Sequence, residues 1–228
     1  MQEQKTVLLE RQEIIAEKAK EIQSIWQKGK IKSEAKSLAI FLGLFSLAVG
    51  GRVALQNVPS VEPIIPIAIL AGLFFGMREG FALGGSAYIV SNFFVWGLQG
   101  PWTIFQAIGA AVPGIFGGAF GKIKNPKARD FVLLSIAGTV FFEITMNVSG
   151  AAMGIGLLGG FSLFTLPVYF ITSAPFSIVH IISNIGFAGA LSPLLKFRRK
   201  ENEFEIVSIS RHSPAGSSSV RVYKSNSD

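Results

Sequence analysis

Between Leu38 and Leu195 the sequence alternates between long uncharged stretches and short clusters of charged residues. Each uncharged stretch approaches the roughly 20 residues that a helix needs to cross the hydrocarbon core of a bilayer. Only 15% of all residues are charged, whereas about a quarter are charged in a typical soluble domain. Because lipid offers backbone groups no hydrogen-bond partners, such stretches form helices in membranes. The sequence therefore predicts an all-α integral membrane bundle.

The breaks between the apolar stretches predict six transmembrane helices. The expected spans cover residues 35–55, 64–76, 80–97, 102–121, 131–152 and 166–195. Residues 1–34 are charged, with apolar residues at helical spacing, and predict an amphipathic N-terminal extension that lies on the membrane surface or against a partner. The charged, Ser-rich residues 196–228 predict a disordered cytoplasmic tail. The membrane domain thus covers residues 35–195.

The distribution of Lys and Arg predicts the orientation of the bundle. With six spans, 20 of the 21 Lys and Arg residues fall on one side, and Arg52 is the exception. Cytoplasmic loops carry such an excess of positive charge, so both termini are expected in the cytoplasm. The same distribution argues against nucleic acid as the reason for the net charge of +7.

Small residues recur every four positions in several predicted spans. Gly72, Gly76, Gly80 and Gly84 form one such stripe, and Ala35, Ala39 and Gly43 form another in the first span. Small residues let two membrane helices approach closely. Most such stripes serve packing within one chain, but a stripe on a terminal helix also suits docking to another membrane protein.

Two ionisable residues are expected deep in the bundle, where each marks a candidate site. Glu143 lies 12 residues after Phe131, and His180 lies 15 residues before Leu195. At 1.5 Å per residue their depths are about 18 and 22 Å, so we expect neighbouring helices and a Glu143–His180 contact. Asn147 and Asn184 lie one turn further along each helix. This contact either contributes to a binding site or only holds two helices together.

A second polar set lies at shallower positions, near the predicted outer connections. Trp side chains at such depth commonly belong to an interfacial belt, and Arg52 with Glu62 is also compatible with a plain surface pair. A pocket open to the exterior is the alternative, because aromatic and amide groups suit a flat, partly polar ligand. The set consists of Arg52, Gln56, Asn57, Glu62, Asn92, Trp96, Gln99, Trp102 and Gln106.

Catalysis is not expected from this sequence. The chain has no cysteine and only two histidines, of which His212 lies in the tail, so a zinc site cannot be assembled in the bundle. No phosphate-binding loop of the Walker type occurs, which excludes ATP hydrolysis by that route. We therefore expect no enzyme activity, no metal and no cofactor.

Several motifs together resemble the substrate-binding S components of energy-coupling factor (ECF) vitamin transporters. The resemblance covers roughly residues 35–195, and its pieces are individually loose but occur in a specific order. They are Gly51-Arg52-Val53-Ala54, Val58-Pro59-Ser60-Val61-Glu62-Pro63, the Gly72 to Gly84 stripe, Gly100-Pro101-Trp102-Thr103 with Gln106, Gly114 with Gly117-Gly118, and Pro175-Phe176 with His180 and Asn184.

This resemblance implies a multi-pass protein of the cell membrane that captures a vitamin or related micronutrient, with cobalamin as one candidate, at the outer face. It also implies docking onto a transmembrane coupling protein with two ATPase subunits. In that family docking uses small residues on the first helix, which Ala35, Ala39 and Gly43 match. The charged extension of residues 1–34 is longer than the family usually has.

The sequence thus predicts a substrate-binding subunit of an ECF-type importer. The alternative is a stand-alone six-helix secondary carrier or channel for a small solute, which often shows internal repeats that we do not find here. A structural scaffold is a third possibility. The predicted substrate-binding residues are Arg52, Asn92, Trp96, Trp102, Gln106, Glu143, Asn147 and His180.

Overall fold

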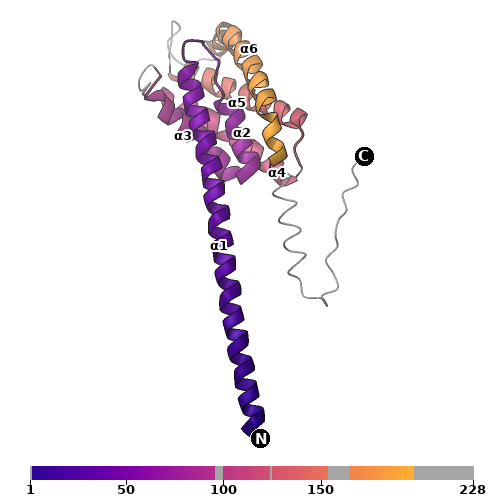
Figure 1. The fold of residues 1–228 in the computed structure, drawn as a ribbon. Coiled ribbons are helices and arrows are strands. Elements are labelled where there is room, and N and C mark those ends of the chain that lie inside the picture. The colour runs from indigo at the N-terminus through magenta and orange to yellow at the C-terminus, as the bar shows by residue number, and fades with distance from the viewer. Residues whose placement is uncertain (1, 96–99, 124, 154–164, 198–228) are drawn as a thin grey trace.

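The computed structural model describes residues 2–95, 100–123, 125–153 and 165–197, without the side chains of residues 2–16, 19 and 165. These residues form six α-helices and a final 3-10 turn, and no strand occurs in these ranges (Figure 1). The elements are α1 (Gln2–Ala54), α2 (Ile64–Phe75), α3 (Met77–Asn92), α4 (Trp102–Ile123), α5 (Ala128–Met153), α6 (Thr165–Leu191) and η1 (Ser192–Leu194).

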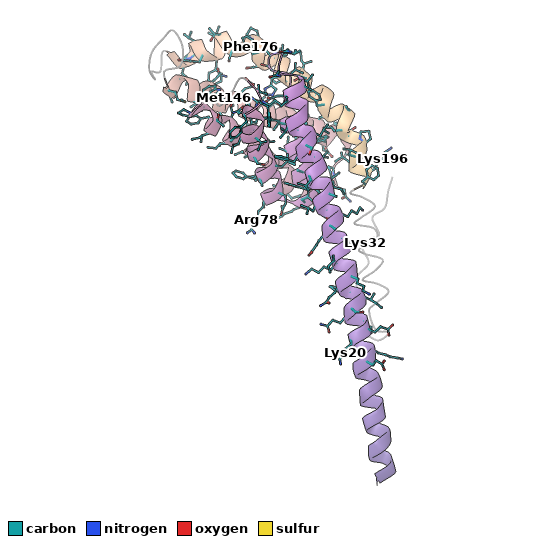
Figure 2. The ribbon with its side chains drawn as sticks, turned by 60° about the vertical axis from the view of Figure 1, so that its left-hand side comes forward. Lys20, Lys32, Arg78, Met146, Phe176 and Lys196 are labelled. Carbon is teal, nitrogen blue, oxygen red and sulfur yellow. The ribbon has the colours of Figure 1, made fainter. Side chains whose placement is uncertain are left out.

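Helix α1 is one uninterrupted helix of 53 residues, which differs from the expected division at residue 34. It contains no proline, and among residues 28–36 only Gly29 disfavours a helix, so no residue there is a strong helix breaker. Its N-terminal part projects away from the other helices, past Lys32 and Lys20 (Figures 1 and 2). The extension and the first span are therefore continuous.

Among the residues that the structure describes, four helices are long and apolar enough to cross a membrane, namely those within residues 20–54, 102–123, 128–153 and 166–197. Helix α2 is apolar but has only 12 residues, which corresponds to about 18 Å and is shorter than a bilayer core of roughly 30 Å. Helix α3 has 16 residues. The prediction of helices in six places is confirmed, whereas full spans at residues 64–76 and 80–97 are not.

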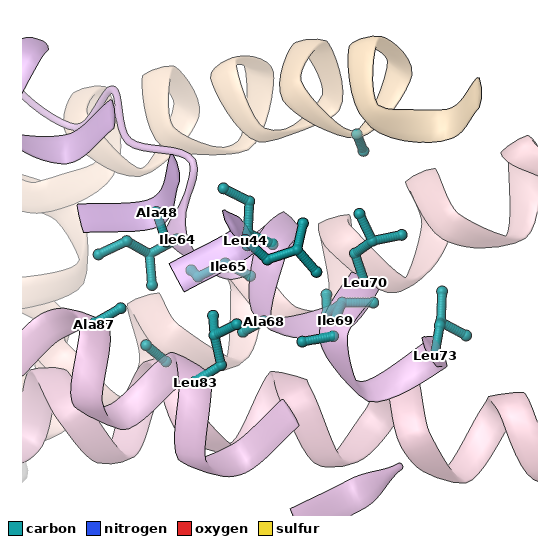
Figure 3. Packing of buried hydrophobic residues seen from close by; sticks show 14 of the residues in the cluster. Leu44, Ala48, Ile64, Ile65, Ala68, Ile69, Leu70, Leu73, Leu83 and Ala87 are labelled. Atoms are coloured by element: carbon teal, nitrogen blue, oxygen red, sulfur yellow. The ribbon is translucent and has the colours of Figure 1, made fainter. Parts of the chain in front are cut away.

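Helix α2 lies at the centre of the bundle. Every residue from Ile64 to Leu73 is buried, and the side chains of Leu44 and Leu83 from two other helices pack around it (Figure 3). The outer helices instead expose large apolar side chains, such as Ile171 and Ile182 on α6. An apolar exterior around a packed centre is the arrangement expected of helices surrounded by lipid.

Glycines bring the backbones of α2, α3 and α4 into direct contact. A Cβ atom added at Gly72 or Gly80 would overlap the backbone of Gly114, and one added at Gly118 would overlap the backbone at the start of α3. Gly76 forms the turn between α2 and α3 with φ of 121°, a conformation that favours glycine. The glycine stripes of these helices thus serve packing within the chain.

Candidate polar site

Arg52 stands at the centre of a buried polar site, two residues before the end of α1. Its Nε donates a hydrogen bond to Glu62 Oε2 at 2.8 Å, and its Nη1 donates to Ser91 Oγ at 2.7 Å and to Asn92 Oδ1 at 2.6 Å. Only 7% of Arg52 and 9% of Glu62 are exposed. Of the two interpretations of Arg52 and Glu62, a plain surface pair is therefore wrong, because the pair is buried against α3 and the connection between α1 and α2.

Asn92 extends this site from α3 to α4. Its Nδ2 donates to Thr103 Oγ1 at 3.0 Å and to Gln106 Oε1 at 2.8 Å, while its Oδ1 accepts from Arg52. Asn92 and Gln106 are both buried. An amide satisfied on both sides fixes the orientation of its partners. The structure thus brings together three of the residues predicted from the sequence.

Aromatic rings connect Arg52 with the deeper part of the bundle. The Arg52 guanidinium lies over the Tyr88 ring at 4.4 Å from its centroid, within the range of a cation–π interaction. Tyr88 stacks on Phe142 at 5.3 Å, and Phe142 meets the His180 ring edge-on at the same separation. This column of rings connects Arg52 on α1 with His180 on α6.

Glu143 and His180 form the predicted contact between α5 and α6. His180 Nδ1 lies 2.6 Å from Glu143 Oε1, and Ser177 Oγ donates to Glu143 Oε2 at 2.5 Å. His180 is 2% exposed. The prediction from matching depths is confirmed, since these two helices pack against each other with the two residues in register.

Glu62 joins the two ionic groups into one network. Its second carboxylate oxygen, Oε1, lies 3.5 Å from His180 Nε2, which is within ion-pair range. Neither of these two atoms has a hydrogen-bond partner among the described residues. The chain of contacts therefore runs from Gln106 through Asn92, Arg52, Glu62 and His180 to Glu143.

Asn147 and Asn184 lie beside this chain of contacts. Asn147 accepts a hydrogen bond from Ser173 Oγ at 2.7 Å and donates to the backbone oxygen of Glu143 at 2.8 Å. Asn184 donates to Thr139 Oγ1 at 2.8 Å. Both residues therefore link α5 to α6, and Asn147 also orients the turn that carries Glu143.

A pocket of about 160 Å³ opens beside Arg52. Its walls are Arg52, Glu62, Val95 and most of the residues from 55 to 61, which form the connection between α1 and α2. Since one water occupies about 30 Å³ of liquid, the space suits a small molecule or one group of a larger ligand. The guanidinium, the carboxylate and the Gln56 amide provide both donors and acceptors.

One predicted site residue, Trp102, falls outside this network. Trp102 is half-buried, and its ring lies next to Gly150 on α5. Trp96 lies outside the described residues. Glu62 belongs to the predicted outer polar set but was not among the predicted substrate-binding residues, and Tyr88, Ser91, Thr103 and Ser177 were in neither. The spacing from Tyr88 to Asn92 and from Ser177 to His180 is one helical turn, so helical periodicity from the polar residues already chosen would have found both.

The fold and the buried site define the chain as a multi-pass membrane protein. Over 137 residues it is 26% identical to the galactose-proton symporter of Escherichia coli strain K12, and equally to that of strain O6:H1. The match covers 54% of this chain and 30% of the symporter, so the chain spans less than a third of the curated relatives it matches. No family model and no solved structure matches. The comparison supports a general class, membrane transport.

Proposed function

We propose that this chain is a membrane transport protein that binds a small polar solute at the pocket beside Arg52. The observation that carries the proposal is the buried network of Arg52, Glu62, His180 and Glu143. Ionisable groups are expensive inside a membrane, and those that persist there usually mark the path of a solute or an ion. A plain scaffold needs no such network beside an open pocket.

A secondary carrier, in which the chain works without an ATPase, is the form that the comparison favours. The proteins it matches are named as galactose-proton symporters. A carrier of this kind needs a solute pocket next to groups that exchange protons. Here the pocket wall includes Glu62, which also faces His180. Galactose is therefore the first solute to test, together with other sugars.

An S component of an ECF importer is the second candidate, and the state of α1 favours it. Ala35, Ala39 and Gly43 are all exposed, and the position of a Cβ on Gly43 is open. This stripe serves no packing with the described helices, in contrast to the glycines of α2, α3 and α4. A vitamin such as cobalamin is then captured by this chain, and a coupling protein with two ATPase subunits completes the importer.

Uptake into proteoliposomes separates the two candidates. The purified chain alone, with an acidic exterior, is expected to accumulate labelled galactose or another sugar if it is a proton-coupled carrier. If it is an S component, the chain alone binds cobalamin or another vitamin without accumulating it. Binding of no sugar and no vitamin by the wild-type chain, measured by equilibrium dialysis, would refute the transport proposal.

Ala39→Leu tests the docking stripe directly. In the S-component form, a bulky side chain there keeps the coupling protein from close approach, so recovery of the complex from detergent-solubilised membranes is expected to fall at least tenfold. Ser37→Leu adds the same side chain at an exposed position on another face of α1, so it is the matched control and should leave recovery unchanged. Recovery from the Ala39→Leu variant equal to wild type would eliminate this surface as the docking site.

A further inference from the structure

The gap between Glu62 Oε1 and His180 Nε2 is the least satisfied place in the polar network. Both atoms are buried, they lie 3.5 Å apart, and neither has a hydrogen-bond partner in the described part of the chain. Buried polar atoms are nearly always paired, so such a facing couple needs an explanation. Each of the two atoms is an acceptor when the imidazole is neutral with its hydrogen on Nδ1.

The partner on the other side of the imidazole sets that tautomer. His180 Nδ1 lies 2.6 Å from Glu143 Oε1, and Glu143 also accepts from Ser177. A carboxylate that accepts from both neighbours requires the hydrogen on Nδ1, which leaves the Nε2 lone pair directed at Glu62. Without another proton, two acceptors then face each other in a buried space.

The charges around His180 favour one additional proton. Glu143 faces it from α5, Glu62 faces it from the connection between α1 and α2, and Arg52 on α1 pairs with Glu62. Helix α2, which also packs against α6, has only apolar side chains. With a neutral imidazole the cluster carries one net negative charge, whereas an imidazolium brings it to zero. A buried unpaired charge is strongly disfavoured.

We infer that the Glu62–His180 gap is a proton-binding site, filled when His180 becomes an imidazolium that bridges Glu62 and Glu143. The added proton sits on Nε2 and donates to Glu62 Oε1, so one proton satisfies both orphan atoms. Imidazole is suited to this task because it exchanges protons between about pH 5 and 8. No bond to carbon forms or breaks, and the proton comes from and returns to water.

The site also lies where a bound proton would act on the solute pocket. Glu62 and Ser60 belong to the connection that walls the pocket, and Ser183 on α6 donates to the Ser60 backbone oxygen at 3.2 Å. Ser60 adopts φ of 59° without being glycine, a backbone strain that needs such support. Protonation of His180 therefore gives the connection between α1 and α2 a second hydrogen bond to α6, in addition to the bond between Ser183 and Ser60. This role in transport rests on the proposed function, whereas the proton site does not.

Nitrogen-15 magnetic resonance of the histidine ring in lipid vesicles tests the site without any solute. The chain has two histidines, so full-length His212→Asn protein labelled at histidine reports on His180 alone. We expect a neutral Nδ1–H tautomer at high pH and a doubly protonated ring at low pH. A ring that stays neutral from pH 5 to 8, or a neutral form with its hydrogen on Nε2, would overturn the inference.

Glu62→Gln provides the second readout, because it removes the carboxylate that stabilises the imidazolium. The midpoint of the transition is expected to move to lower pH by about one unit or more. Glu62→Asp keeps the charge and should move it less, which preserves the test if the amide variant does not fold. Glu79→Gln, exposed at the start of α3, is the control. Equal midpoints in wild type and Glu62→Gln would contradict the site even if solute uptake were observed.

Discussion

Gly114→Leu is expected to prevent formation of the folded bundle. A Cβ atom at Gly114 would overlap the backbone of Gly80 on α3, and Gly72 on α2 approaches the same position. Backbone cannot rotate aside as a flexible side chain can, so the helices must separate. Overpacking of a core typically costs about 1–3 kcal/mol, and we expect more than that here because the obstacle is backbone.

The measurement is the yield of monodisperse protein in detergent, followed by thermal unfolding observed by circular dichroism. Gly43→Leu is the matched control, because nothing lies near a Cβ at that position and the same side chain is added to a membrane helix. We expect wild-type yield and melting for the control. If Gly114→Leu melted at the wild-type temperature, the close packing of α2, α3 and α4 would be wrong.

Arg52→Met is expected to destabilise the protein by about 3–5 kcal/mol. Methionine keeps much of the side-chain volume but removes the guanidinium that pairs with Glu62. Among the described residues, the imidazole of His180 is the other basic group in ion-pair range of Glu62. It also removes the hydrogen bonds to Ser91 and Asn92. A buried carboxylate without its cation accounts for most of the cost. Chemical unfolding in detergent, followed by far-ultraviolet circular dichroism, measures the loss.

The double variant Arg52→Met with Glu62→Gln isolates the ionic part of this loss. Because the carboxylate is then absent, the double variant should be more stable than Arg52→Met alone. Arg78→Met, exposed at the start of α3 (Figure 2), serves as the control and should change stability by less than about 0.5 kcal/mol. Losses that simply add in the double variant would show that Arg52 and Glu62 are not coupled.

The sequence was sufficient to predict the pairing of Glu143 with His180. Their similar depth depends only on the rise of an α-helix and on where each apolar stretch begins, so residue counting located both groups. The four-residue spacing predicted close helix contacts, but the structure was needed to show that the stripes of α2, α3 and α4 pack within the chain while the one on α1 does not. Arg52, Asn92 and Gln106 were also chosen correctly as members of one polar group.

The contact between Glu62 and His180 was beyond such reasoning. It joins a connection near the end of the bundle to the middle of α6, and its geometry depends on the path of residues 55–63, which helical periodicity does not determine. The boundary at residue 34 stays a prediction, because helix continuity does not test it. Charge marks where a chain leaves lipid, whereas the backbone of α1 continues unchanged across that boundary. The short length of α2 has a related cause, since burial among other helices replaces the need to reach both membrane surfaces.

The glycine contacts between α2, α3 and α4 limit which parts of the protein can shift during a transport cycle. Backbones in direct contact leave no side chains between them that could exchange rotamers, so sliding of one helix past another would cost most of the packing. These three helices therefore form a rigid body. Helix α1 meets this body through larger side chains, and α6 packs mainly against α5, so displacement is expected at these two interfaces. The polar network crosses both of these interfaces, through Arg52 and through His180. Its ionic contacts therefore contribute to the free energy of any rearrangement.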